Sequence, residues 1–196
     1  LAYDHGAVSH RWLTPEMSDP KGEQLRAIKV WLGQHERIKY IWIDEPCMWQ
    51  NERSDSEQDE FDRMLLNINL LYLGMTVLIL LDISYMSRFW TQFEAWCAMQ
   101  DLTPSGIAPT DSESRFHIEC LGTAAHSPEL NRQVLLATWR GKSPHDAYSV
   151  LSSKDVQVTN QTDKKFILPK ILELNETVKR AFKARPEIWD RRCLRS

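Results

Sequence analysis

The chain has 196 residues, of which 42% are apolar, and a formal net charge of −3 from 24 Lys and Arg against 27 Asp and Glu. This composition supports a full hydrophobic core in one ordinary domain and excludes collagen-like and low-complexity chains. The weak, slightly acidic charge argues against a general binder of nucleic acids or anionic membranes, because those binders need clustered positive charge. The longest apolar run, residues 70–81, is too short to span a bilayer.

The first predicted elements are a strand, a helix and a second strand. Residues 7–9 (AVS) predict a short strand that leads into His10. Asp19 followed by Pro20 predicts the start of a helix, because the acid can cap it and proline is tolerated at the first helical position. Apolar residues then recur at helical spacing. Residues 38–43 (IKYIWI) are β-branched and aromatic, which predicts a strand ending at Asp44.

The middle of the chain repeats this alternation of helix and strand. Ser54-x-x-Glu57 is typical of a capping box and precedes an amphipathic helix. Residues 76–81 (TVLILL) show no polar alternation, as expected of a strand that is covered on both faces in a parallel sheet. We expect a helix over residues 87–100 and a further strand over residues 116–121.

The last third is predicted to be mainly helical. Helices over residues 129–139 and from Ser143 onward lie within a longer segment, about residues 121–153, that we interpret as an insertion or extra helices. A short strand over residues 156–159 and a helix led by Pro169 follow. Residues 1–185 are predicted to form a single domain, and residues 186–196 a basic tail.

The alternation of strands and helices predicts a three-layer α/β/α fold with a central, mostly parallel, five-stranded sheet. Ligands of such sheets bind beyond the carboxyl ends of the strands, which here are residues 10–12, 44–50 and 82–90. None of these loops carries a dinucleotide-binding or P-loop glycine pattern, a GxSxG nucleophile elbow or an HExxH metal motif. The four cysteines are dispersed without a CxxC pair, which argues against a cysteine zinc site or a disulfide scaffold and favours a reducing, cytoplasmic location.

One helical segment carries a candidate catalytic group. Trp90 and Glu94 are four residues apart and therefore share a helix face near the carboxyl edge of the sheet. A carboxyl group held against an indole is partly dehydrated, which raises its pKa and is typical of functional sites. The alternative, which spacing leaves open, is a solvated surface glutamate that caps the helix or pairs with Arg88.

The order of these motifs resembles the TIR (Toll/interleukin-1 receptor) domain family. The resemblance rests on Ser9-His10-Arg11, on Ile41-Trp42-Ile43-Asp44, on the strand at 76–81, and on Ser84-Tyr85-x-Ser87-Arg88-x-Trp90-x-x-x-Glu94. Residues 24–44 are also similar to the matching part of NAD-cleaving animal TIR domains. The resemblance covers about residues 7–100 well and the rest by the order of its elements.

The resemblance implies a flavodoxin-like fold and an NAD+ hydrolase that cleaves the bond between nicotinamide and ribose. It implies that the products are nicotinamide and ADP-ribose or a cyclic ADP-ribose, with self-association through TIR–TIR contacts as the activating step in immune or cell-death signalling. No cofactor or metal is implied, because NAD+ is the substrate. Glu94 matches the catalytic glutamate of enzymatic TIR domains. The residues expected to bind substrate are Ser9, His10, Arg11, Trp12, Asp44, Trp49, Ser84, Tyr85 and Trp90. Arg11 would hold the pyrophosphate, Trp90 would form an aromatic wall, and Trp12, Trp49 and Tyr85 are candidates to stack on a base.

Two other functions remain open on the sequence. A non-catalytic TIR adaptor would act by homotypic interaction through the loop after Asp44, and Glu94 would then be incidental. A nucleoside deoxyribosyltransferase-like enzyme would also place a glutamate near the carboxyl edge of a parallel sheet. Fold alone does not decide between these functions.

Overall fold

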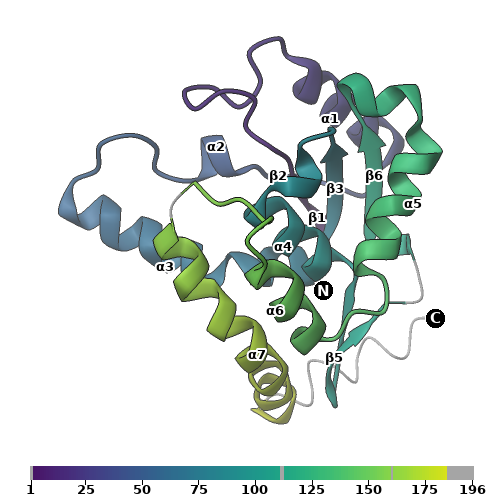
Figure 1. Cartoon of the computed structure of the whole chain (residues 1–196). Helices are drawn as coiled ribbons and strands as arrows, with labels where there is room; N and C mark the ends of the chain where they lie inside the picture. The colour runs from purple at the N-terminus through teal and green to yellow at the C-terminus, as the bar shows by residue number, and fades with distance from the viewer. Residues whose placement is uncertain (1, 111–112, 160, 185–196) are drawn as a thin grey trace.

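A four-stranded parallel sheet forms the centre of the molecule (Figure 1). The computed structural model describes residues 2–110, 113–159 and 161–184. In these residues the sheet has the order β2-β1-β3-β6, and each strand pairs in parallel with its neighbour. Its strands are β1 (Ala2–Ser9), β2 (Tyr40–Trp42), β3 (Met75–Leu81) and β6 (Phe116–Cys120).

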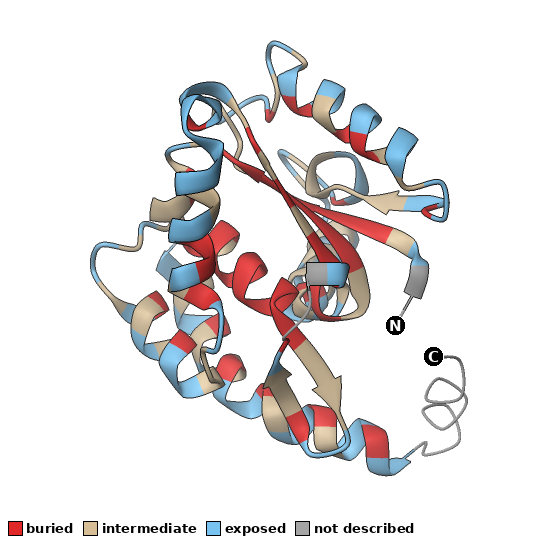
Figure 2. Ribbon diagram, turned by 90° about the vertical axis from the view of Figure 1, so that its right-hand side faces the viewer, coloured by how far each residue is buried: buried red, intermediate tan, exposed pale blue. Residues whose placement is uncertain are grey.

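The central strand β3 is covered on both faces, as its unbroken apolar sequence predicts. Successive side chains point to opposite faces of a strand. Val77, Ile79 and Leu81 therefore join the larger core cluster, whereas Leu78 and Leu80 join a second, smaller cluster on the other face. Figure 2 shows these buried strands running between helices on either side, which gives the predicted three layers.

Helix α1 (Glu23–Gln34) covers the face that carries the smaller cluster, through Ile28 and Trp31. The predicted start of this helix at Asp19 is wrong, because Gly22 adopts a left-handed conformation (φ 68°) directly before the first helical residue. Asp19 still serves the helix, since its carboxylate accepts a hydrogen bond from the backbone N–H of Leu25 at 2.8 Å. The acid therefore caps the helix from a turn that precedes it.

Most other helices pack on the opposite face. They are α3 (Asp55–Gly74), α4 (Phe89–Ala98), α5 (Pro128–Trp139), α6 (Pro144–Ser152) and α7 (Gln161–Ala184). Short helices link the larger elements: α2 (Asp44–Cys47) and the 3₁₀ turns η1 (Tyr85–Ser87), η2 (Glu113–Arg115) and η3 (Gly122–His126). The predicted capping box at Ser54 and Glu57 is confirmed, and α6 begins with the same arrangement.

A β-hairpin between α4 and η2 was not predicted. Strands β4 (Gln100–Thr103) and β5 (Gly106–Pro109) pair antiparallel and form a separate two-stranded sheet. Gly106 has φ 117°, and a Cβ at this position would lie 2.0 Å from the Asn175 side chain of α7. Asn175 accepts a hydrogen bond from the Ile107 N–H at 3.0 Å, so the hairpin is fastened to the C-terminal helix.

Two predictions for the C-terminal third are wrong. Residues 156–159 make only a single bridge, between Gln157 and Arg88, so the central sheet has four strands within the described residues rather than five. Pro169 lies inside α7 instead of leading it. The buried stripe of Ile167, Ile171 and Leu174 runs across this proline, and its packing outweighs the local preference to start a helix there. The predicted basic tail, residues 186–196, lies outside the described residues.

No helix in the described part of the chain is both long enough and apolar enough to cross a membrane.

Candidate functional site

A cleft of about 440 Å³ opens at the carboxyl edge of the sheet, where the fold class places ligands. One wall is apolar and comes mainly from α3, through Phe61, Leu65 and Ile68. The polar residues come from the ends of β1 and β2, from α4 and from the start of α7. The ionisable ones among them are His10, Arg11, Asp44, Arg88, Glu94 and Asp163. A mostly apolar cleft with a few convergent polar groups is typical of a small-molecule site.

Glu94 lines this cleft and is 7% exposed. The alternative of a solvated surface glutamate is therefore wrong. Ser9 Oγ donates a hydrogen bond to Glu94 Oε2 at 2.7 Å. Because the Ser9 proton is used in this way, the Tyr85 hydroxyl, 2.5 Å from Ser9 Oγ, must be the donor of that second bond. The two hydrogen bonds, from Tyr85 to Ser9 and from Ser9 to Glu94, fix one oxygen of the Glu94 carboxyl group from beneath the cleft.

The surroundings of Glu94 favour its neutral form. Burial raises its pKa to about 8, and the negative charge of Asp44 acts in the same direction. The hydrogen bond from Ser9 and the charge of His10 oppose this increase. The sequence predicted a raised pKa next to Trp90. The structure gives the same direction, but the dehydration comes from the whole buried helix α4.

His10 links the cleft to two other elements. Its Nε2 lies 2.8 Å from Asp44 Oδ1, and its Nδ1 lies 2.6 Å from Gln24 Oε1. The Gln24 amide donates to the Arg11 carbonyl at 2.8 Å, so its oxygen faces His10. Both ring nitrogens therefore face acceptors, which is the pattern of a protonated imidazole.

The charges of His10 and Asp44 stabilise one another. Burial disfavours the charged form of His10, but the hydrogen bond and charge of Asp44 outweigh it and raise the His10 pKa. Burial likewise opposes ionisation of Asp44, but hydrogen bonds from His10 and from Trp12 Nε1, at 2.8 Å, lower the pKa of Asp44. This pair is therefore an ionised bridge across the mouth of the cleft.

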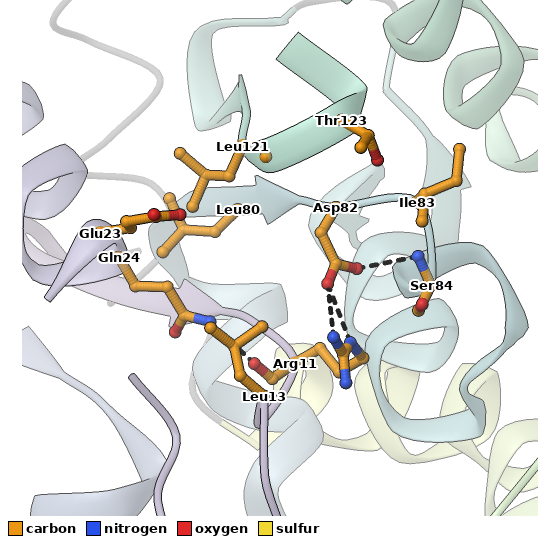
Figure 3. A pocket seen from close by; sticks show the side chains of 11 residues that line it. Arg11, Leu13, Glu23, Gln24, Leu80, Asp82, Ile83, Ser84, Leu121 and Thr123 are labelled. Atoms are coloured by element: carbon orange, nitrogen blue, oxygen red, sulfur yellow. Dashed lines mark hydrogen bonds and ion pairs between the residues drawn. The ribbon is translucent and has the colours of Figure 1, made fainter. Parts of the chain in front are cut away.

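Arg11 is occupied by protein partners. Its Nε and one terminal nitrogen contact Asp82 Oδ2 at 2.9 and 2.8 Å, and its other terminal nitrogen donates to the Trp12 carbonyl. Figure 3 shows this ion pair within a second, smaller cavity of about 150 Å³, which Arg11 also lines. The guanidinium fork expected to hold pyrophosphate is thus already used. Ser84 lines this second cavity, and its N–H donates to Asp82.

The tryptophans expected to contact a substrate are placed differently from one another. Trp90 lines the cleft, packs edge-to-face on Phe93 and donates to Asp163 Oδ2 at 3.3 Å. Trp12 lines the mouth of the cleft. Trp49 is 44% exposed, bonds to Glu60 and is not part of the lining.

The structure therefore brings together most of the residues that the sequence singled out. Those lining the cleft are His10, Arg11, Trp12, Asp44, Trp90 and Glu94. Ser9 and Tyr85 lie beneath it, and Ser84 and Trp49 lie elsewhere. Sequence reasoning did not assign Arg88 or Asp163 to a ligand site. Arg88 belongs to the Ser-Arg-x-Trp string and could have been noticed there, whereas Asp163 carries no local signal.

Neither metal-ligand groups nor comparison with known proteins assigns a function to this cleft. Within the described residues, no group of three or more His, Cys, Asp or Glu side chains comes together as a set of metal ligands. No protein-family model, curated protein or solved structure matches the chain.

Proposed function

We propose that this protein is a TIR-type NAD+ hydrolase in which Glu94 is the catalytic residue. The observation that carries the proposal is a single buried carboxyl group, oriented by Ser9, that faces a cleft walled by Trp90. The strand order β2-β1-β3-β6 supports it as well, because these four parallel strands follow the first four positions of the flavodoxin-like order. Cytoplasmic location and activation by self-association in immune or cell-death signalling belong to the same proposal.

The chemistry requires little beyond this carboxyl group. When the N-glycosidic bond breaks, its electron pair returns to the ring nitrogen, so nicotinamide leaves as a neutral molecule without an acid. Positive charge then develops on the ribose, and an ionised Glu94 stabilises it strongly in a cleft of low polarity. Water attacks C1′ and releases a proton, which Glu94 can accept. The proton that Glu94 holds in the empty cleft must first leave, and a bound pyridinium cation favours its departure.

The test is nicotinamide release from NAD+ by the purified protein over a range of protein concentrations. We expect release by the wild type and a loss of at least about 100-fold for Glu94→Gln, because the charge on the carboxylate supplies the stabilisation. Glu36→Gln is the matched control, since Glu36 is exposed and lies away from the cleft. Equal rates for the wild type and Glu94→Gln, or no release at any concentration, would overturn the proposal and leave the adaptor function.

A further inference from the structure

Arg88 lines the cleft and directly precedes the first residue of α4. Its backbone is held in place, because the Phe89 N–H donates to the Gln157 carbonyl and the Gln157 N–H donates to the Ser87 carbonyl, both at 2.7 Å. The side chain therefore projects from a fixed point. It is half-buried, and no hydrogen bond or ion pair to its guanidinium exists within the described residues.

The other arginine that lines the cleft is occupied, because Arg11 is bound to Asp82. A guanidinium has five N–H donors that match the oxygens of a phosphate. An unpaired guanidinium inside a cleft thus has unused donors, and an anionic group of a ligand would supply their acceptors.

The spacing to Glu94 suits a nucleotide. Arg88 directly precedes α4 and Glu94 is the sixth residue of this helix, which corresponds to a separation of about 9 Å along the helix axis. Trp90 lies between them and lines the same cleft. In an N-ribosyl nucleotide the reacting C1′ and the 5′-phosphate also lie at opposite ends of the ribose. A sugar placed over Trp90 can therefore present C1′ to Glu94 and its phosphate to Arg88.

The acids that share the cleft do not occupy Arg88. Asp44 is bound to His10 and Trp12, and the described partner of Asp163 is the indole of Trp90. We propose that Arg88, rather than Arg11, binds the phosphate of the substrate, so that the substrate class is a phosphorylated N-riboside and not the free nucleoside. This inference rests on the proposed function, because it concerns the same cleft.

The experiment compares substrates that share one glycosidic bond and differ in phosphate: nicotinamide riboside, nicotinamide mononucleotide and NAD+. Charge-assisted bonds to phosphate predict a wild-type kcat/KM about 10- to 100-fold higher for the mononucleotide than for the riboside. Arg88→Gln should reduce kcat/KM about 10- to 100-fold more for the mononucleotide than for the riboside, so that the preference is lost. Arg88→Lys keeps part of it, because the charge remains but the planar fork is lost. Arg63→Gln, an exposed arginine of α3, is the matched control.

A second measurement does not depend on turnover. Isothermal titration with ADP-ribose should show binding to the wild type and to Arg63→Gln, with at least about 10-fold weaker binding to Arg88→Gln. Arg88-dependent binding of ADP-ribose without nicotinamide release would contradict the proposed hydrolase and support the phosphate site. Nicotinamide release from the riboside and the mononucleotide at equal rates, unaffected by Arg88→Gln, would support the hydrolase and contradict the phosphate site. Absence of both release and ADP-ribose binding overturns the phosphate site together with the hydrolase.

Discussion

Glu94 is a buried residue of the cleft lining, and its protonation state determines whether the carboxylate is present. Burial raises its pKa to about 8, so the neutral acid dominates below that pH in the free protein. Since kcat/KM reports ionisations of the free enzyme, we expect kcat/KM for nicotinamide release to rise with pH and to level off above about pH 8. Ser9→Ala removes a donor that lowers this pKa, and should move the rise to higher pH. A flat profile between pH 6 and pH 9 would contradict this role.

The burial of Glu94 also makes the free energy of unfolding depend on pH, in a direction that can be tested. The folded-state pKa of Glu94 lies above the ordinary value of 4.5, so the folded chain holds the proton more tightly than the unfolded chain does. The free energy of unfolding therefore falls as pH rises from about 4.5 to about 8. Glu94→Gln lacks this contribution, so the Tm of Glu94→Gln minus that of the wild type should grow as pH rises across this window. Thermal unfolding at several pH values measures it. A margin that stays constant with pH would contradict the effect, and Glu36→Gln serves as control.

Arg115 connects the ends of several elements. Its guanidinium donates to carbonyls at the C-terminus of α3, at the start of β3, at the C-terminus of α4 and at the start of β4. The acceptors are Tyr72, Leu73, Met75, Cys97, Ala98 and Gln100. The last carbonyls of a helix have no partner within the helix, and burying them unpaired is costly. Arg115 supplies those partners for α3 and α4 at once.

Removal of this side chain should be strongly destabilising. We expect Arg115→Leu to lower the free energy of unfolding by more than about 3 kcal/mol, since several buried acceptors lose a charged donor together. Urea denaturation measures the change. Arg63→Gln on the exposed face of α3 should change stability by less than about 0.5 kcal/mol. An Arg115→Leu protein as stable as the wild type would show that water replaces the guanidinium.

Patterns of neighbouring residues were enough to predict several helices and strands. The strand TVLILL and the capping box at Ser54 depend on neighbouring residues alone, and both are present as predicted. The start of α1 follows the left-handed conformation of Gly22, and the position of Pro169 within α7 follows the packing of a buried stripe, so the sequence rules misplaced both. The same distinction applies to the site. The shared face of Trp90 and Glu94 follows from helix geometry, whereas the Arg11–Asp82 pair joins residues 71 positions apart.

The main core joins both ends of the described chain. It includes Ala7 of β1, Trp96 of α4 and Leu174 of α7, and the cleft likewise draws on residues from His10 to Asp163. A single core predicts cooperative unfolding, so tryptophan fluorescence and far-ultraviolet circular dichroism should give the same urea midpoint. Two separate midpoints would contradict the prediction that residues 1–185 form a single domain.

Ser9 is the last residue of β1, and its backbone pairs with Ile79 in the middle of the sheet. The carboxyl group of Glu94 is therefore oriented by a rigid strand as well as by the helix that carries it. A shift of α4 along its axis would stretch the 2.7 Å bond and misalign the acid, even if the apolar wall from α3 stayed in place. Displacement of one helix is thus sufficient to turn such a site off, whatever event causes it.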